Sequence, residues 1–139
     1  MSIKAAVDAL CDLTVTGVTV YDLAALPGAV VTLPCLIPQL NFSRHGLEYF
    51  TTAEDGVVTM EIEHVLLVAG LQQGLAATRN YSVLAHVDNY IAALKADWRL
   101  NDTLIKPLRI IGINWSPQTW AGVLYIGCAF RHEWQVFFD

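Results

Sequence analysis

Residues 57–98 read VVTMEIEHVLLVAGLQQGLAATRNYSVLAHVDNYIAALKADW, and the hydrophobic period changes partway along this stretch. Over residues 58–68 apolar side chains alternate with polar and acidic ones, which predicts a strand with one buried face. Gly70 and Gly74 then interrupt the pattern. Over residues 76–98 the apolar side chains recur at helical spacing, which predicts a long amphipathic helix. The predicted stripe of this helix consists of Val83, Val87, Tyr90, Ile91, Leu94 and Trp98.

Weaker patterns on either side of this stretch predict the remaining elements. Ser2 can cap a short helix, and residues 18–21 are typical of a short strand. A second strand is expected over residues 30–37, where two prolines favour an edge position or an early end. Further strands are expected over residues 108–115 and, as one long alternating stretch, over residues 120–138. The order predicts an α+β fold with a mostly antiparallel sheet of about four to five strands and two helices packed on one face.

The composition is unusually apolar for a chain of 139 residues, which is long enough for one domain spanning residues 1–139. Hydrophobic residues make up 55% and charged residues 15%, and the mean hydropathy is +0.45. Globular domains usually carry about 25% charged residues. A membrane helix needs about 20 apolar residues, and the uncharged apolar run at 121–130 is too short. We therefore expect no membrane contact and excess apolar surface that is buried against other protein subunits.

Charge and cysteine content exclude further classes of function. The formal net charge is −5, and the eight basic residues are scattered, whereas a nucleic-acid-binding protein concentrates them. Tight DNA binding is therefore not expected. Cys11, Cys35 and Cys128 form neither a metal motif nor an even disulfide set, so we expect free, buried, reduced thiols and an intracellular folding compartment.

No spacing of reactive residues predicts catalysis, a cofactor or a metal site. His64 lies on the apolar parity of its strand, where it is either a buried base or, in the favoured interpretation, a hydrogen-bonded core or interface histidine. His132 interrupts an apolar row without partners at metal-ligand spacing. Glu61 and Glu63 share the other parity and are expected to face outward, as a solvated face or a subunit contact. We therefore expect a protein that is not an enzyme.

Residues 39–56 have no clear period and are expected to form a long loop or arm. Aromatic and arginine side chains are typical anchors of protein interfaces. The alternative is that this loop folds over the sheet of its own subunit. The candidate interface residues are Phe42, Arg44, His45, Tyr49 and Phe50.

Taken in order, the segments match one known arrangement. The matching segments are IKAAVDAL at 3–10, VYD at 20–22, ALPGAVV at 25–31, TMEIEH at 59–64 before the long helix, NDTL at 101–104 after it, and YIGCAF at 125–130 leading to Val136. This order resembles that of the tail terminator (tail-completion) proteins of long-tailed bacteriophages, and the resemblance covers nearly the whole chain. The arm at 39–56 and the last three residues have no counterpart in it.

The resemblance implies a structural virion protein of the tail and neck, made in the host cytoplasm. Such a protein forms a ring, usually a hexamer, that ends polymerisation of the tail tube and contacts the head–neck connector proteins. DNA passes through the ring without specific binding. Two alternatives stay open: another neck or head-completion subunit, or a small ligand-binding or enzymatic α+β domain that uses His64 or His132 in a pocket.

Overall fold

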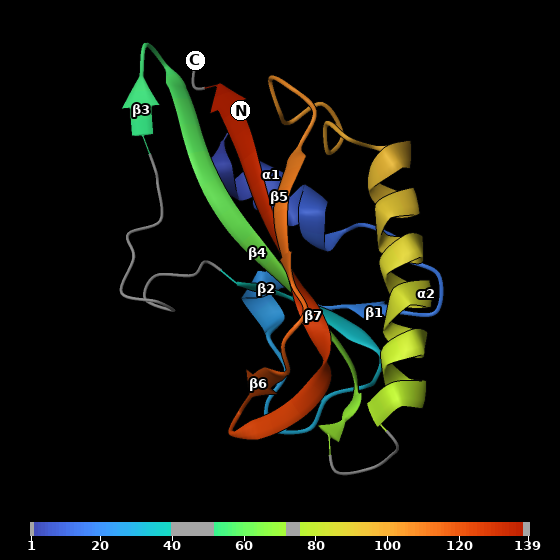
Figure 1. The fold of residues 1–139 in the computed structure, drawn as a ribbon. Coiled ribbons are helices and arrows are strands. Elements are labelled where there is room, and N and C mark those ends of the chain that lie inside the picture. Colours follow the sequence, from blue (N-terminus) through green and yellow to red (C-terminus); the bar gives the residue numbers. More distant parts are fainter. Residues whose placement is uncertain (1, 40–51, 72–75, 138–139) are drawn as a thin grey trace.

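The computed structural model describes residues 2–39, 52–71 and 76–137 (Figure 1). The fold is α+β: two α-helices and a seven-strand mixed, mostly antiparallel sheet, as the sequence predicts for its class. The helices and strands in chain order are α1 (Ile3–Cys11), β1 (Thr19–Val20), a 3-10 turn η1 (Leu23–Ala25), β2 (Cys35–Gln39), β3 (Thr52–Glu54), β4 (Val57–Gly70), α2 (Ala76–Ala96), β5 (Arg109–Asn114), β6 (Gln118–Trp120) and β7 (Val123–Phe137).

The sheet has a main path of five strands in the order β1-β2-β4-β7-β5, and two short strands extend it. β3 pairs with β4, and β6 pairs with β7. Among the described strands, only β1 and β2 run parallel. The four to five predicted strands correspond to the main path. The two additional strands, β3 and β6, have three residues each, which is too short for an alternating pattern to be recognised.

The long antiparallel pair of β4 and β7 forms the centre of the sheet. Its register runs from Val57 opposite Phe137 to Gly70 opposite Tyr125, with a bulge between Leu67 and Ala69. Gly127 lies at this bulge, and a Cβ there would overlap the backbone carbonyl of Leu66. Only glycine allows the two strands to approach this closely.

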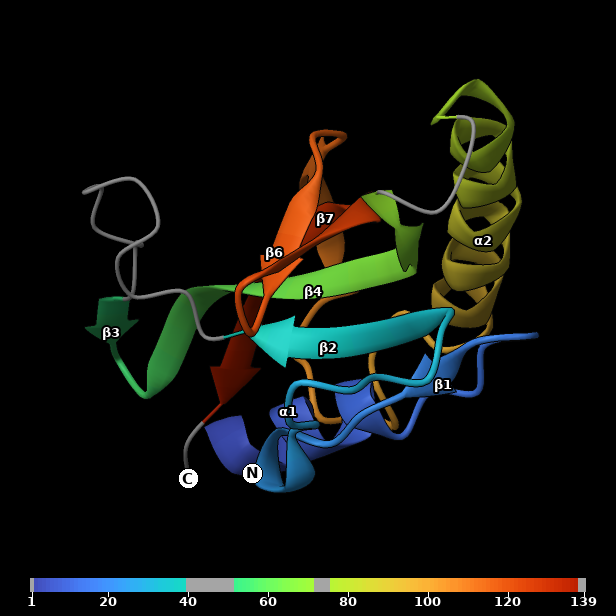
Figure 2. The same cartoon turned by 90° about the horizontal axis from the view of Figure 1, so that it is seen from below.

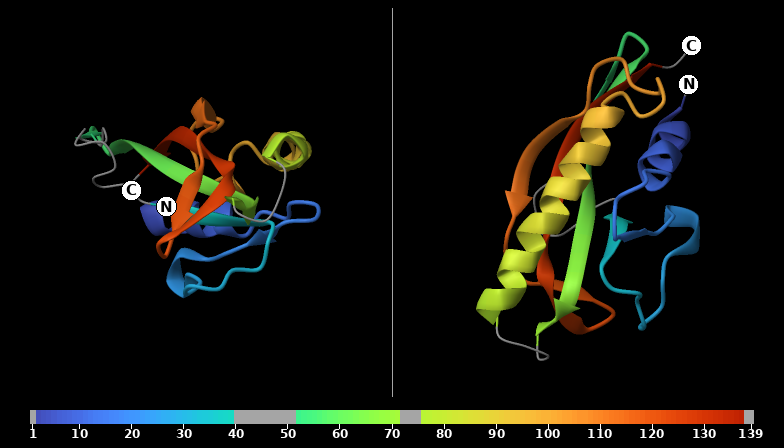
Figure 3. Two further views of the ribbon diagram at one scale, coloured as in Figure 1. Left: turned by 60° about the horizontal axis from the view of Figure 1, so that its bottom comes forward. Right: turned by 90° about the vertical axis from the view of Figure 1, so that its right-hand side faces the viewer.

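One face of this pair, which we call the helix-covered face, consists of the even-numbered residues from Met60 to Val68 and from Ile126 to Val136. All of them are buried, together with Val83, Val87, Tyr90 and Leu94 of the predicted stripe and the apolar side of α1, whereas Ile91 and Trp98 of that stripe are half-buried. Both helices belong to the same hydrophobic core. α2 runs along the sheet, and α1 lies beside the end at which β7 finishes (Figure 3).

The other face, which we call the open face, divides into two halves. Near the bulge, a second apolar cluster is covered by the chain between η1 and β2 and by Trp120 of β6. The Trp120 indole N–H donates to the carbonyl of Gly28 at 2.9 Å, and the Tyr21 hydroxyl accepts from the Thr32 N–H at 3.0 Å. The other half carries the half-buried side chains of Thr59, Glu61, Arg131, Glu133 and Gln135.

Two expected strands differ from the observed ones. Residues 120–138 do not form one strand, because Ala121 and Gly122 adopt positive φ values of 50° and 79° and turn the chain between β6 and β7. Trp120 therefore packs on the open face, and Leu124 is exposed, rather than both joining the helix-covered row.

The strand expected over residues 30–37 begins only at Cys35 and includes Pro38. β1 pairs only with Cys35 and Leu36 of β2, so β2 has no partner on the β1 side at Pro38. The missing N–H of Pro38 therefore costs no hydrogen bond to β1. At the first helix the expectation is confirmed, since the Ser2 hydroxyl accepts from the Ala5 N–H at 3.0 Å.

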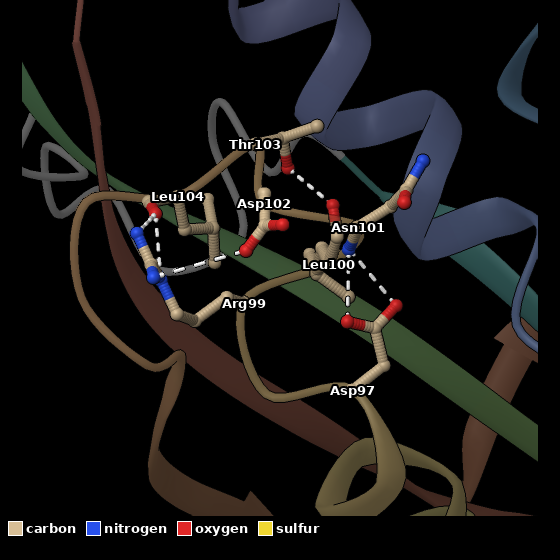
Figure 4. Close-up of polar contacts among 7 residues, drawn as sticks. All are labelled: Asp97, Arg99, Leu100, Asn101, Asp102, Thr103 and Leu104. Atoms are coloured by element: carbon tan, nitrogen blue, oxygen red, sulfur yellow. Dashed lines mark hydrogen bonds and ion pairs between the residues drawn. The ribbon is translucent and has the colours of Figure 1, made fainter.

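The connection from α2 to β5 contains three consecutive left-handed residues, 100–102, with φ values of 48°, 56° and 57° (Figure 4). Side chains on both sides hold them. Both carboxylate oxygens of Asp97 accept from the Asn101 N–H at 2.9 Å, and the Arg99 guanidinium donates twice to the Leu104 carbonyl. These side-chain bonds satisfy backbone N–H and C=O groups that have no helical partner after α2 ends. The chain then turns back toward the sheet.

Candidate functional site

Three buried polar side chains meet between α2 and the helix-covered face. Nδ1 of His64 on β4 lies 3.0 Å from the Tyr90 hydroxyl on α2, and the same hydroxyl lies 2.9 Å from Nε2 of His132 on β7. Nδ1 of His132 lies 3.2 Å from the backbone carbonyl of Ile62. The sequence predicted the burial of His64 but not this cluster, because the two histidines meet only through the β4–β7 register, which places Ile62 opposite His132.

The direction of each hydrogen bond follows from the acceptor at the end of the chain. A carbonyl only accepts, so Nδ1 of His132 carries the proton and its Nε2 is an acceptor. The Tyr90 hydroxyl therefore donates to His132 and accepts from Nδ1 of His64. In this arrangement both imidazoles are neutral and Nε2 of His64 bears a lone pair. That nitrogen has no hydrogen-bond partner among the described residues.

The surroundings of the cluster favour these neutral forms. Burial lowers the pKa of His132 to about 4, although its bond to the Ile62 carbonyl acts in the opposite direction. Burial, and then the neighbouring His132, lower the pKa of His64 well below its usual value. Burial likewise raises the pKa of the Tyr90 hydroxyl. Both histidines are 0% exposed and are therefore out of reach of a substrate in solution. The hydrogen bonds of the cluster connect α2 to β4 and β7.

The acidic pair on the open face differs from its prediction. The Glu61 carboxylate accepts from Nη2 of Arg131 at 2.9 Å, which agrees with a partly solvated strand face. Glu63, however, is only 3% exposed, so its expected outward, solvated position is wrong. The reason is its place within the sheet, between Gln39 of β2 and Arg131 of β7, whose strands cover it from both sides.

The three cysteines are free and buried, as predicted. Burial raises the pKa of the Cys35 thiol to about 11 and that of Cys128 to about 12, so both stay protonated at neutral pH. Within the described ranges, no group of three or more histidine, cysteine or acidic side chains is arranged to hold a metal ion. In the same part of the chain, neither helix has the length and hydropathy needed to cross a membrane.

The predicted interface residues of the arm lie outside the described residues, and their role stays a prediction. These residues are Phe42, Arg44, His45, Tyr49 and Phe50.

An open groove of about 670 Å³ lies between α1 and the C-terminal end of α2. Its polar lining includes the carboxylates of Asp8, Asp12 and Asp97, and neither histidine nor cysteine lines it. Asp8 is already paired with Lys4 at 2.6 Å. The groove therefore presents a mainly acidic polar surface.

Large apolar side chains are exposed in three places among the described residues, one of which is Trp115, between β5 and β6, at 54%. The hairpin patch comprises Leu26 and Val30, in the loop before β2, and Val123 and Leu124, at the β6–β7 turn. Val123 pairs with Trp120 and shares its side of the hairpin, whereas Leu124 pairs with Thr119 and points to the other side. The Trp120–Gly28 hydrogen bond holds that loop against the hairpin. The helix patch consists of Tyr81 and Leu84 on the outer side of α2, with exposed fractions of 77% and 49%.

The hairpin patch belongs to a part of the molecule that carries no formal charge. Asp, Glu, Lys and Arg are absent from residues 23–43, 64–78 and 110–130. The described parts of these segments include β2, the second half of β4, most of β5, β6 and the first half of β7, which pair within one sheet. At this end of the sheet, where β6 lies in Figure 1, apolar surface is exposed without any charged side chain from these segments.

Sequence reasoning foresaw an excess of apolar surface but placed the interface in the arm. The signal for the hairpin patch was present in the three long uncharged segments, which become one surface only when the sheet register is known. Comparison with known proteins adds no relative: no protein-family model matches the chain, and no curated protein matches it significantly.

Proposed function

We propose that this chain is a structural subunit that assembles with copies of itself into a ring capping a phage tail tube. The observation that carries the proposal is the uncharged end of the sheet with its exposed hairpin patch. Soluble monomers rarely leave large apolar side chains clustered on a surface without charge, whereas subunits of assemblies bury such surfaces against their neighbours.

The position of the ring comes from the resemblance to tail terminator proteins. In this proposal the ring, a hexamer by analogy, ends the tail tube and contacts the tube protein on one side and the head–neck connector on the other. The function requires no catalysis, cofactor or metal. Both histidines of the central cluster then serve the fold, which agrees with their complete burial.

The net charge suits a channel through which DNA passes. A chain with charge −5 and scattered basic residues makes few phosphate contacts, so DNA slides past it without being held. A ring that gripped phosphates would oppose movement of the genome.

Mass measurement and imaging together test the proposal. We expect light scattering of the purified chain to show a closed oligomer, or imaging of assembled phage particles to show a ring of this protein at the head-proximal end of the tail. A chain that stays monomeric in solution and is absent from that position in particles would overturn the proposal. Images that locate this protein elsewhere in the neck would instead favour the alternative of a head-completion subunit.

A further inference from the structure

We infer that acid releases α2 from the sheet while the central strands stay paired, and that the release takes up two protons, one on His64 and one on His132. The inference concerns the subunit itself and does not depend on the proposed ring. It starts from the way in which α2 is attached to β4 and β7.

The Tyr90 hydroxyl is a polar contact between α2 and both central strands. It lies 3.0 Å from Nδ1 of His64 on β4 and 2.9 Å from Nε2 of His132 on β7. Around it, Val83, Val87 and other apolar side chains of α2 pack into the same core. Figure 2 shows α2 at the outside of the molecule, so the helix can move away without passing through the sheet.

The hydrogen bonds of the cluster are complete only while both histidines are neutral. The Tyr90 hydroxyl has one hydrogen, which it donates to Nε2 of His132, and it accepts from Nδ1 of His64. A proton on Nε2 of His132 leaves that hydroxyl hydrogen without its acceptor. A proton on Nε2 of His64 creates a donor at an atom that has no partner among the described residues. Either proton therefore adds a buried charge and an unpaired donor to the core, which is costly.

Within the part of the chain that the structure describes, no acidic side chain of this core compensates such a charge. The other titratable groups that face the cluster are the thiols of Cys11 on α1 and Cys128 on β7, and β5 places Ile110 opposite His132. The charged residues of β4 and β7 have the parity of the open face, and those described in the two helices are exposed. The exposed ones are Lys4, Asp8, Asp88 and Lys95.

The sheet keeps its own connections when α2 leaves. β4 and β7 are joined by backbone pairing from one end to the other. The apolar cluster of the open face, which includes Cys35 and Val65, contains no described residue of α2. Once α2 has moved away, water reaches both histidines, and the pKa of each returns to about 6.5. Between about pH 6 and 5 the opened form therefore binds two protons that the closed form does not.

Thiol labelling of the wild-type chain measures this opening, because Cys128 lies on the helix-covered face and is fully buried. A dithiodipyridine reagent, which reacts with thiols in acid as well, is applied at a series of pH values. The rate at Cys128 is divided by the rate in the chain unfolded in urea at the same pH. We expect this ratio to rise about 100-fold from about pH 7.5 to about pH 5.5, since each histidine contributes about tenfold.

Hydrogen exchange of the β4 and β7 amides measures separation of the strands under the same conditions. If α2 leaves while the strands stay paired, these amides should open at least about tenfold less than Cys128 does at about pH 5.5. Equal opening at both places would overturn the inference, because α2 would then leave only when the whole chain unfolds. A rise of about tenfold or less at Cys128 would overturn the uptake of two protons.

Glutamine variants assign the protons. In His64→Gln and in His132→Gln the rise at Cys128 should be only about tenfold over the same pH range. His86→Gln is the matched control, because His86 lies half-buried on α2 and outside the hydrogen-bonded cluster, and most of the 100-fold rise should remain. Two pH values are compared within each variant, so a loss of stability common to both cancels.

The variants can also contradict the inference. An undiminished rise in His64→Gln or His132→Gln would assign the protons to other groups, and an equal loss of the rise in His86→Gln would assign one of them to His86. If a glutamine variant does not fold, the comparison of Cys128 with the strand amides in the wild-type chain decides.

Discussion

On the helix-covered face of β4 and β7, burial is continuous from one end of the sheet to the other, whereas on the open face it changes character midway. The same two strands supply both faces. On the first, α1 and α2 exclude water, and the polar groups His64, Tyr90 and His132 are hydrogen-bonded to one another. On the second, the chain covers only one half, and ion pairs occupy the other.

The difference shows which surfaces the fold completes by itself. A face that is buried throughout determines subunit stability, and its substitutions should act on folding. A face that is covered in part leaves apolar side chains at the rim of its cover, and substitutions there should act on assembly. The predictions below test this division, beginning with the largest expected effect.

The bulge at Gly127 connects the two faces, and Gly127→Ala should disrupt both. The new Cβ would overlap the Leu66 carbonyl, so the central strands must separate. We expect the free energy of unfolding to fall by about 4 kcal/mol or more, or the chain not to fold. Urea denaturation measures this. Gly112→Ala is the matched control, since nothing lies within 4 Å of its Cβ position, and equal losses in both variants would refute the role of the bulge.

Mild acid should lower the free energy of unfolding through the buried histidines of the helix-covered face rather than through the open face. Because the pKa of His132 is lowered from 6.5 to about 4, the unfolded state binds this proton at a higher pH than the folded state does. The free energy of unfolding should be constant above pH 6.5 and fall as the pH decreases toward 4, by about 3 kcal/mol from His132 alone. His64 acts in the same direction.

Urea titrations at a series of pH values between 7.5 and 4 measure this slope. Replacement of His132 by Gln should reduce the slope between pH 6.5 and 5, where carboxylates contribute little. An unchanged slope in that variant would show that the acid sensitivity lies elsewhere in the chain.

Tyr90→Phe removes the hydroxyl that links the two histidines. The Nδ1–H of His64 loses its acceptor and Nε2 of His132 loses its donor, both at buried positions. We expect a loss of about 2 kcal/mol in the free energy of unfolding at pH 7.5. Tyr81→Phe on the exposed side of α2 is the control and should change stability by less than about 0.5 kcal/mol. Similar values for the two variants would show that the linked hydroxyl is not structural.

The charged half of the open face should contribute less. Glu61→Gln weakens the pair with Arg131, whose side chain is 42% exposed, and we expect a loss of about 0.5 to 1 kcal/mol that decreases in high salt. Lys4→Gln, in a more exposed helical pair, should cost still less. If Glu61→Gln cost as much as Tyr90→Phe, the two faces would not differ in the way proposed.

At the β6–β7 turn, Leu124→Ser should leave subunit stability within about 0.5 kcal/mol of the wild type, because the side chain is already 49% exposed. Assembly should weaken in the same variant. Thermal unfolding of the dilute chain and light scattering at high concentration separate the two effects. A large loss of stability without a change in assembly would place Leu124 in the fold instead.

The sequence predicted those elements whose period is long enough to recognise. The alternation over 58–68 and the helical stripe of α2 lead directly to β4 and α2, because one buried face imposes its period on the residues. Ser2 as a helix cap follows from the same local chemistry.

What the sequence left out depends on register and on turns. The contact of His64 with His132 through Tyr90 exists only for one pairing of β4 with β7. The turn at Ala121 and Gly122 is hidden inside a stretch that alternates on both sides of it. Glu63 is buried by strands that are distant in sequence, which no local pattern indicates.

The place of β7 in the chain has a consequence for biosynthesis. Its partners β4, β5 and β6 all precede it, and Val57 at the start of β4 pairs with Phe137 at the end of β7. At about 5–20 residues per second, a nascent chain spends several seconds with β4 already made and its central partner still inside the ribosome. During this interval an apolar strand edge is exposed to chaperones and to other nascent chains. The slow step of folding therefore follows the emergence of β7, and truncations that remove it should yield insoluble chains rather than partly folded subunits.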